Sequence, residues 1–531
     1  PFLGGASTVF GIMPDWNPAE VIGTRPRPLA MSLYRDVITD SIWAYQRSNY
    51  GYRNLRGHPL MVEFAGQPFI DVRVSFNSFI PADLPPTLAS RLVDHYLERL
   101  VDLPKHHDKV EFEIVYSCYV FGMDERLEGL LGEGFSQSDT QNLSDALRRL
   151  TNRVVDPSVG LWKKDWERIA VLEARRREIA DSNLNLVSRV HWLLEDCRRY
   201  GTLPFAGLAR CGFIARQIVD SLVETGILTA ERRAAFMASI STVNSRLVDS
   251  HANSERDMFL AEFGHLRPGT YEITSKRYDE TPDDYFDFQS PPDQSQVNCA
   301  TFEFTPDEAR TVDSRMKAEG LVGDAVSLLE FLRAGIELRE EAKFQFTRNI
   351  SDLLVHLVTW GEELGLSRDE LSFVRIDCVR DAMTTSVNQR ELLSDLVVEG
   401  RANYALSRAT WLPSLIVQPE DVYCFEVSDD EPNFVTQQSI IAGVGRPDRS
   451  DEMKGRIAIV ASADPGYDWL FAAGIVGLIT AYGGVNSHMA IRSYELGLPA
   501  AIGIGERRFS RLLNTSRLLL DCGSRRIEVI E

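Results

Sequence analysis

The sequence has few cysteines and no cysteine pattern. Seven cysteines, an odd number, are scattered from Cys118 to Cys522 without a C-x-x-C pair. This usage predicts reduced thiols in a cytoplasmic protein, with no disulfides and no structural zinc. The adjacent pair His106-His107 has no accompanying carboxylate–histidine spacing, so we expect a surface loop there and no metal.

Positive charge and long apolar runs are also scarce. The chain has 57 Lys and Arg residues against 77 Asp and Glu residues, a net charge of −20, which argues against nucleic-acid and membrane partners. The most apolar run, Trp469 to Val485, is interrupted by four glycines, so we expect a strand, a turn and a strand there. The chain begins Pro-Phe-Leu-Gly-Gly, without a Met or an apolar leader, and we expect a processed or truncated product.

A nucleotide-binding signature is missing as well. The sequence has no Gly-rich loop followed by Lys and Ser or Thr, and no ATP-grasp signature. Any phosphate that this acidic chain binds must therefore be held at a local site. The hydrophobic content of 44% over 531 residues is nevertheless enough for more than one domain with a sizeable core.

One histidine stands at the start of a predicted helix. Ser487 is a good N-cap, Gly497 lies where a left-handed residue ends a helix, and Pro499 prevents continuation, so a helix is predicted from His488 to Leu496. Unpaired backbone N–H groups in its first turn favour an anion, such as a phosphate carried on the imidazole. A neutral imidazole is also a competent nucleophile near neutral pH.

The stretch from Gly483 to Ala500 (GGVNSHMAIRSYELGLPA) resembles the phosphohistidine motif of the PEP-utilising enzymes, a family that includes pyruvate phosphate dikinase, phosphoenolpyruvate synthase and rifampicin phosphotransferase. The resemblance implies that His488 is the catalytic residue and that Gly484, Ser487 and Arg492 stabilise its phosphate. Three further stretches match the same domain: Asn433 to Thr436, Asp464 to Gly466, and Ala472 to Val476. The alternative is a glycine loop with a structural histidine.

One departure from the motif bears on the chemistry. Tyr494 stands where the family has an arginine. Arg492 follows His488 by four residues and so lies on the same helical face, and whether it substitutes for the missing charge is open.

The fold class predicted is multidomain α+β. Residues 1–427 are expected to form a large, mainly helical acceptor-binding domain with a small sheet near 60–122, built from Phe69 to Ile80 and Val110 to Phe121. Helical spacing covers three stretches: Thr87 to Leu100, 138–260, and Thr305 to Leu364. Asp287 to Asn298 is expected to be a surface loop. Residues 428–432 are expected to be a hinge linker, and the resemblance assigns 433–531 to a compact β/β/α swivelling phosphohistidine domain.

Two looser resemblances point to an acceptor site in the helical domain. Phe259 to Pro282 and Leu338 to Phe373 are similar to segments of rifampicin phosphotransferase and phosphoenolpyruvate synthase-like proteins. They imply an acceptor site containing His265, Arg267, Glu272, Arg277, Arg339 and Lys343. Phosphoryl transfer needs cations for the moving oxygens and a base for the acceptor proton, here His265 or Glu272. The alternative is that Arg339 and Lys343 only pair with neighbouring glutamates.

The function implied is that of a dikinase-type phosphotransferase subunit or fragment. His488 would carry a phosphoryl group to a small-molecule hydroxyl acceptor, and ATP and Mg would be bound by an ATP-grasp domain or partner absent from this chain. One alternative is a phosphoenolpyruvate synthase-like enzyme acting on pyruvate, although the carboxyl-terminal barrel of such enzymes is not found in this sequence. Another is a non-catalytic regulatory or binding protein that keeps the swivelling fold, which Tyr494 favours.

Overall fold

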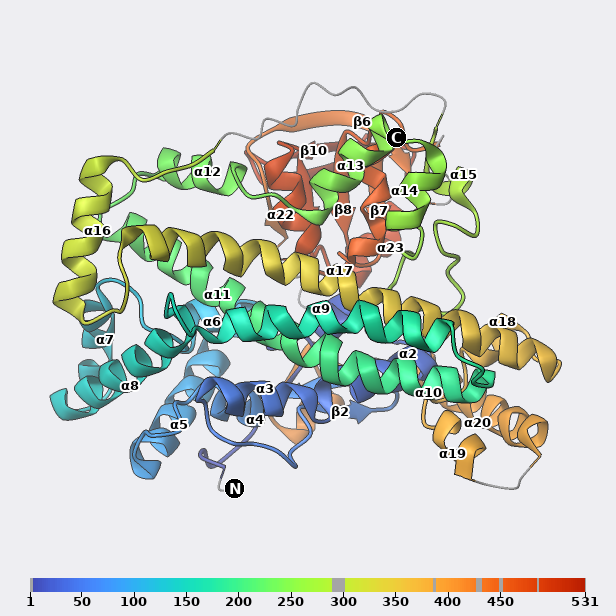
Figure 1. The fold of residues 1–531 in the computed structure, drawn as a ribbon, viewed down its shortest axis with the longest axis horizontal. Coiled ribbons are helices and arrows are strands. Elements are labelled where there is room, and N and C mark those ends of the chain that lie inside the picture. Colours follow the sequence, from blue (N-terminus) through green and yellow to red (C-terminus); the bar gives the residue numbers. More distant parts are fainter. Residues whose placement is uncertain are drawn as a thin grey trace.

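Helices form most of the chain up to Ala409, and a unit built around a β-sheet follows (Figure 1). The computed structural model describes residues 3–288, 301–384, 388–425, 432–447, 452–484 and 487–530. The predicted hinge linker therefore lies outside the described residues except for Pro432, as does the predicted surface loop beyond Phe288.

The helical part contains short helices around a few long ones. Its helices are α1 (Pro18–Val21), α2 (Pro28–Tyr34), α3 (Ile42–Tyr50), α4 (Val72–Asn77), α5 (Pro86–Asp102), α6 (Val110–Glu113), α7 (Met123–Gly132), α8 (Gln137–Val155), α9 (Leu161–Ala180), α10 (Leu186–Asp196), α11 (Leu203–Glu224), α12 (Ala230–Ala238), α13 (Val243–Asn253), α14 (Arg256–Phe263), α15 (Pro282–Tyr285), α16 (Pro306–Glu319), α17 (Ala325–Glu363), α18 (Arg368–Leu371), α19 (Cys378–Thr384) and α20 (Gln389–Ala409). The three predicted helical stretches are confirmed.

The longest helix, α17, has 39 residues and packs along α9, α10 and α11. It starts at a capping box, in which the Asp324 side chain accepts from the Ser327 amide and Ser327 returns the bond. Its Phe331, Leu353 and Leu357 side chains are buried in the main apolar core. Each such side chain contributes roughly 1.5–3 kcal/mol by leaving water, so α17 is fixed by packing along its length.

The small sheet of the helical part has four strands in the order β2-β3-β1-β4, all antiparallel. Its strands are β1 (Phe10–Gly11), β2 (Met61–Phe64), β3 (Gln67–Asp71) and β4 (Leu415–Ile416). The strand predicted from Phe69 to Ile80 ends at Asp71, because the Asp71 carboxylate accepts from the Val74 amide at 3.1 Å and so starts α4.

The prediction of a strand from Val110 to Phe121 is wrong. The segment starts as the short helix α6 and continues as irregular backbone within the core. Buried backbone groups need hydrogen-bond partners, and here side chains supply them in place of a neighbouring strand. These bonds run from Tyr52 to the Ser117 carbonyl (2.7 Å), from the Tyr119 amide to Thr151 (2.8 Å), and from the Phe121 amide to Ser221 (3.2 Å).

The C-terminal unit, residues 432–530 as far as they are described, is built on a seven-stranded sheet in the order β11-β10-β6-β7-β8-β9-β5. Strands β6 to β9 are parallel, and the outer strands are antiparallel. The elements are β5 (Asn433–Phe434), β6 (Ser439–Gly445), β7 (Ile457–Val460), α21 (Trp469–Ala472), β8 (Gly477–Thr480), α22 (His488–Glu495), β9 (Ala500–Ile502), α23 (Glu506–Leu512), β10 (Arg517–Asp521) and β11 (Arg526–Val529).

The region from Trp469 to Val485 is not a strand, a turn and a strand. It begins as helix α21, and among its described residues, 469–484, only β8 is a strand. Trp469 and Leu470 are adjacent and both fully buried, which a strand with alternating faces does not allow when one face is solvated.

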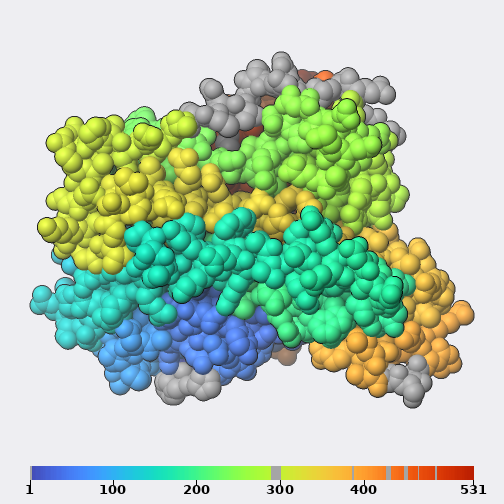
Figure 2. All heavy atoms as spheres, viewed as in Figure 1, coloured from blue at the N-terminus to red at the C-terminus, as the bar shows by residue number. Residues whose placement is uncertain are grey.

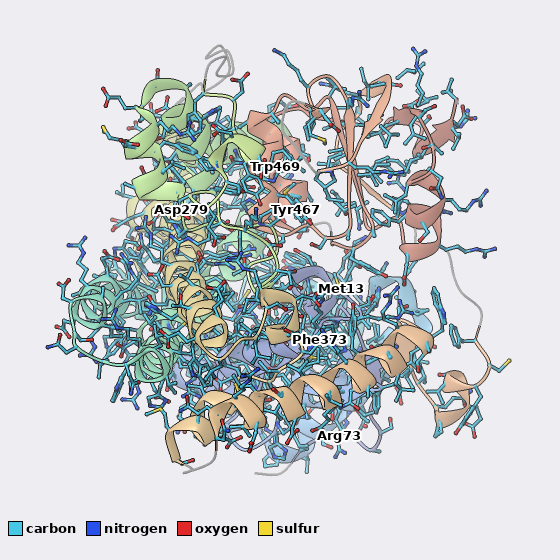
Figure 3. The ribbon with its side chains drawn as sticks, turned by 90° about the vertical axis from the view of Figure 1, so that its right-hand side faces the viewer. Met13, Arg73, Asp279, Phe373, Tyr467 and Trp469 are labelled. Atoms are coloured by element: carbon cyan, nitrogen blue, oxygen red, sulfur yellow. The ribbon has the colours of Figure 1, made fainter. Side chains whose placement is uncertain are left out.

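The helical part and the C-terminal unit share a continuous interface. One apolar cluster contains Phe263 and Tyr278 from the segment 243–288 together with Trp469 and Met489 from the C-terminal unit. In the space-filling view the segment around α13 and α14, together with α17, lies in front of much of the C-terminal unit (Figure 2). Tyr467 and Trp469 lie at this boundary, on the side that faces the segment carrying Asp279 (Figure 3).

Polar contacts close the same interface at two edges. The Tyr278 hydroxyl donates to the Gly466 carbonyl at 2.8 Å, and a Cβ added at Gly466 would meet the Arg267 carbonyl oxygen at 1.9 Å. At the other edge Arg25 forms an ion pair with Glu506 at 2.9 Å, which we call the docking pair. The C-terminal unit is therefore docked closely on the helical part.

Candidate functional site

Helix α22 forms as its local sequence predicts. The Ser487 hydroxyl accepts from the Ala490 amide at 3.2 Å, and Gly497 has a φ of 62°, the left-handed conformation that favours glycine at a helix end. The helix ends at Glu495, one residue before the predicted end. His488 is its first residue, as expected from the N-cap.

Two carboxylates hold the His488 ring, one from each part of the molecule. The Nδ1 atom lies 3.0 Å from Glu340 Oε2 on α17, and the Nε2 atom lies 2.6 Å from Asp468 Oδ1 in the C-terminal unit. The His488 and Asp468 side chains are buried, 8% and 4% exposed, and the Glu340 side chain is 14% exposed. The contact between His488 and Glu340 joins the two parts of the molecule at the predicted catalytic residue.

The surroundings favour the protonated form of His488. Burial is the largest single effect and opposes the charge, but Asp468 and Glu340 together outweigh it and raise the His488 pKa from 6.5 to about 9. Burial also opposes ionisation of Glu340, yet His488, Arg339 and Lys343 hold the pKa of this carboxyl well below its usual range. At neutral pH the ring is an imidazolium that donates from both nitrogens and has no lone pair for nucleophilic attack.

Further buried carboxylates surround this group. Glu20 on α1 accepts from the Gly484 amide at 3.4 Å, so the amide predicted to stabilise phosphate is engaged by a carboxylate in the docked arrangement. Burial raises the pKa of Glu20 and of Asp464, while the positive charge of Lys343 lowers both. Lys343 is thus the cation shared by several buried acids around His488.

Arg492 is turned toward the helical part. Its side chain is buried and donates to the Thr242 hydroxyl at 2.7 Å, and with the Asn244 amide oriented to match, the Asn244 oxygen accepts from Arg492 Nε at 2.8 Å. Tyr494 is 53% exposed and so points away from this site. Arg492, and not residue 494, is therefore the α22 side chain that lies beside His488 in the docked arrangement.

A cavity of about 50 Å³ lies under α22. Its walls come from one face each of α11, α17 and α22, with single residues from α6, α12 and the start of α13. The lining residues are Phe112, Gly212, Phe213, Arg216, Met237, Thr242, Ile336, Arg339, Glu340, His488, Ile491 and Arg492.

The sequence around His488 was compared with models of protein families. Residues 452–525 match the model described as PEP-utilising enzyme, mobile domain. Over most of its length the C-terminal unit is therefore similar to this mobile domain, and we call it the mobile domain below. The match includes both Asp468 and His488 and implies a phosphohistidine-carrying phosphotransferase family. A search of curated proteins finds no match to the chain.

The structure brings two of the predicted acceptor residues to the mobile domain. Arg339 lines the cavity, forms an ion pair with Glu340 at 3.5 Å, and lies over the Phe213 ring at 5.6 Å. Lys343 lies one helical turn further along α17 and acts electrostatically on Glu340. The ion pair between Arg339 and Glu340 is the kind of pairing expected under the alternative interpretation. It lies directly beside His488, because Glu340 also contacts the His488 ring.

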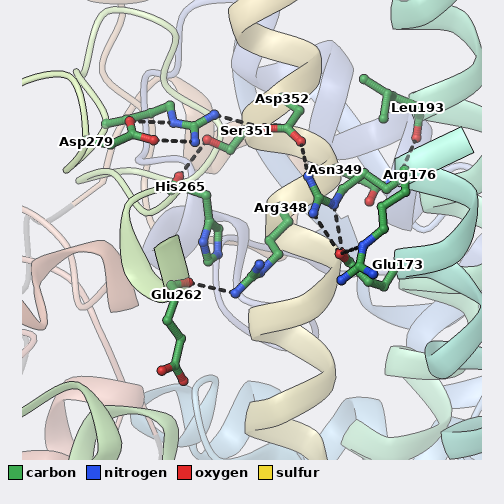
Figure 4. A network of polar contacts seen from close by, with 12 residues as sticks. Glu173, Arg176, Leu193, Glu262, His265, Asp279, Arg348, Asn349, Ser351 and Asp352 are labelled. Atoms are coloured by element: carbon green, nitrogen blue, oxygen red, sulfur yellow. Dashed lines mark hydrogen bonds and ion pairs between the residues drawn. The ribbon is translucent and has the colours of Figure 1, made fainter. Parts of the chain in front are cut away.

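Arg267 and Arg277 belong to a separate polar network along α17. Figure 4 shows their α17 partners, Ser351 and Asp352. Arg277 forms ion pairs with Asp279 at 2.6 Å and Asp352 at 2.9 Å. Arg267 donates to the Ser351 hydroxyl at 3.1 Å, and burial lowers its pKa to about 10. Both cations therefore have structural partners, and neither lines the cavity under α22.

The two candidate bases have local contacts as well. The His265 ring packs edge-on against Phe344, with centroids 4.8 Å apart, and burial lowers its pKa well below the usual value. Glu272 accepts from the amide of Thr274 at 3.1 Å and from its hydroxyl at 2.9 Å. In this structure the carboxylates beside His488 are Glu340 and Asp468, and neither His265 nor Glu272 contacts the ring.

Sequence reasoning missed Glu340 and Asp468. Glu340 follows the predicted Arg339 directly, and Asp468 lies just after the matched stretch Asp464 to Gly466.

Among the described residues, no group of three or more His, Cys, Asp or Glu side chains could hold a metal ion. In the same part of the chain, no helix combines the length and apolar character needed to cross a bilayer.

Proposed function

We propose that this chain is a phosphotransferase in which His488 carries a phosphoryl group to a hydroxyl acceptor bound in the cavity under α22. The observation that carries this proposal is the position of His488, at the start of α22, against Glu340 and above a cavity that the helical part provides. The mobile-domain match supports the carrier role. The cavity supplies the place where an acceptor would meet the carrier.

The charges around His488 suit the transfer step. An acceptor hydroxyl in the cavity attacks phosphorus, its P–O bond forms as the P–N bond breaks, and the bonding electron pair returns to Nδ1, the ring nitrogen that faces Glu340. Glu340 takes the hydroxyl proton, and Arg339, Lys343 and Arg492 lie close enough to the ring to offset the charge of the transferring oxygens. Passing that proton from Glu340 to the ring gives the imidazolium–carboxylate pair of this structure.

The docked arrangement is accordingly the discharged state. An imidazolium cannot accept a phosphoryl group, so His488 must lose a proton and leave Glu340 before it is charged again. We propose that the mobile domain undocks for this step and meets an ATP-grasp domain or subunit that binds ATP and Mg. Such domain motions are a common way for one carrier to serve two sites.

The test is to charge the full chain, with its ATP-dependent donor or with phosphoramidate, and to follow bound phosphate by phosphorus NMR. We expect one phosphate that is labile in acid and stable in alkali, and we expect His488→Ala to abolish it. The matched control is His356→Ala, a half-buried histidine on α17 away from the cavity lining, which should be charged like the wild type. Labelling that persists in His488→Ala, or no labelling of the wild type, would refute the carrier role and favour a binding protein.

A further inference from the structure

We infer that the acceptor is a small alcohol built on a single apolar ring, aromatic or alicyclic. This inference rests on the proposed function and deepens it by naming the class of molecule that the cavity under α22 accepts. It depends on three properties of that cavity: its walls, the position of its charged groups, and its size.

The walls are mainly apolar. Five side chains from five helices line the cavity and are only half-buried, so part of their apolar surface remains open to it: Phe112, Phe213, Met237, Ile336 and Ile491. The Phe112 and Phe213 rings lie 5.9 Å apart at 44°, which gives one wall an aromatic surface. Such walls bind an apolar ring more favourably than a polyhydroxylated molecule. The ring gains free energy by leaving water, whereas the polyhydroxylated molecule would lose its hydrogen bonds to water on entry.

The charged lining residues are engaged with neighbours. Arg216 pairs with Asp220 at 3.0 Å, and Arg339 pairs with Glu340 at 3.5 Å. An anionic acceptor such as pyruvate would have to compete for these cations and approach the negative charge of Glu340. A neutral hydroxyl meets the same carboxylate as a hydrogen-bond acceptor and proton acceptor. The polar end of the cavity therefore suits an uncharged alcohol.

The size of the cavity limits the ring. At about 50 Å³ it is smaller than an apolar cavity of about 150 Å³ that binds benzene, so an acceptor must displace part of the lining. Met237 and Arg216 have long, flexible side chains that can move with little strain. A single ring requires modest displacement, whereas a fused ring system would need the helices themselves to separate.

The inference is tested by charging His488 and timing its discharge with equal concentrations of phenol, cyclohexanol, glycerol or pyruvate. We expect the two ring alcohols to discharge phospho-His488 at least tenfold faster than glycerol or pyruvate, with formation of the phosphate ester. Phe213→Ala should raise the phenol concentration needed for half-maximal discharge at least tenfold while charging of His488 is unchanged. Met237→Ala, on the short helix α12, is the second variant if Phe213→Ala does not fold. Phe304→Ala is the matched control, because Phe304 is also half-buried but does not line the cavity.

The outcomes separate the two proposals. Normal charging of His488 with discharge only to glycerol or pyruvate would overturn the acceptor class and leave the carrier role intact. Equal discharge by phenol in the wild type and in both wall variants would place the acceptor outside this cavity and would also overturn the inference. Failure to charge His488 with both the ATP-dependent donor and phosphoramidate would refute the carrier role, and the acceptor class with it.

Discussion

Replacing Glu340 with glutamine should lower the pKa of His488. The His488 pKa lies at about 9, against 6.5 for an ordinary histidine, because Asp468 and Glu340 outweigh the cost of burial. The difference of roughly 2.5 pH units, at about 1.4 kcal/mol per unit, corresponds to about 3.5 kcal/mol in favour of the charged ring. Glu340→Gln keeps the shape of the side chain but removes one of the two charges, so the His488 pKa should fall by at least about one unit.

The sign of the pH dependence follows from the direction of this shift. A folded-state pKa raised above its ordinary value contributes stability that is fully present below about pH 6.5 and is lost as the pH rises through about 9. The pair formed by His488 and Glu340 joins the mobile domain to α17, so docking should weaken over the same window. Charging of His488, which needs a neutral ring, should become faster there.

Histidine Cε1–H NMR titration measures this pKa directly. A His488→Gln protein assigns the signal, and Glu341→Gln is the matched control, because Glu341 neighbours Glu340 on α17 but bonds Gln345 at 2.7 Å. We expect Glu340→Gln to move the His488 titration to lower pH and Glu341→Gln to leave it in place. A wild-type His488 that titrates near pH 6.5, or no change in Glu340→Gln, would refute the two-carboxylate account.

Three further predictions concern the charge network and the interface. Arg339→Ala should slow discharge of phospho-His488 about 10²-fold or more, whereas Arg277→Ala should leave discharge near normal and lower the melting temperature; the opposite pattern would return Arg277 to the acceptor site. Gly466→Ala places a methyl group 1.9 Å from the Arg267 carbonyl oxygen, so the mobile domain should undock, and an unchanged X-ray scattering profile would contradict this. Arg25→Ala removes the half-exposed docking pair and should weaken docking by about 1 kcal/mol or less, with the loss greatest at low salt; an equal loss at high salt would argue against an ionic contribution.

The start of α22 could be predicted because its signals are local. Ser487, Gly497 and Pro499 act within a few residues of the helix, and the helix follows them to within one residue. Helical spacing also predicted the residues of α17, within the stretch Thr305 to Leu364, but not the start of this helix at its N-cap, Asp324. The acceptor side could not be predicted in this way. Glu340 meets His488 across 148 residues, through docking of two parts of the molecule, and helical spacing carries no information about that contact.

The other predictions that differ from the structure also concern residues whose partners lie far away in the sequence. Val110 to Phe121 has the composition of a strand, but its backbone partners are side chains from distant segments, which an alternating pattern does not reveal. Arg267 and Arg277 have the charge that phosphoryl transfer needs, yet their partners on α17 place them in a structural network. Residue type alone does not separate these two uses of an arginine.

The cavity under α22 is bounded by one long helix that carries charged side chains and by short helices that carry apolar side chains. Arg339, Glu340 and Lys343 stand on the 39-residue α17, which is packed along its length, whereas Phe112 and Met237 come from the short helices α6 and α12. Substitutions in the short helices can therefore reshape one wall of the cavity while leaving the charged groups in place. Under the proposed function, this arrangement makes acceptor choice separable from phosphoryl chemistry, and substitutions in α6 and α12 are the ones that should change which acceptor the protein uses.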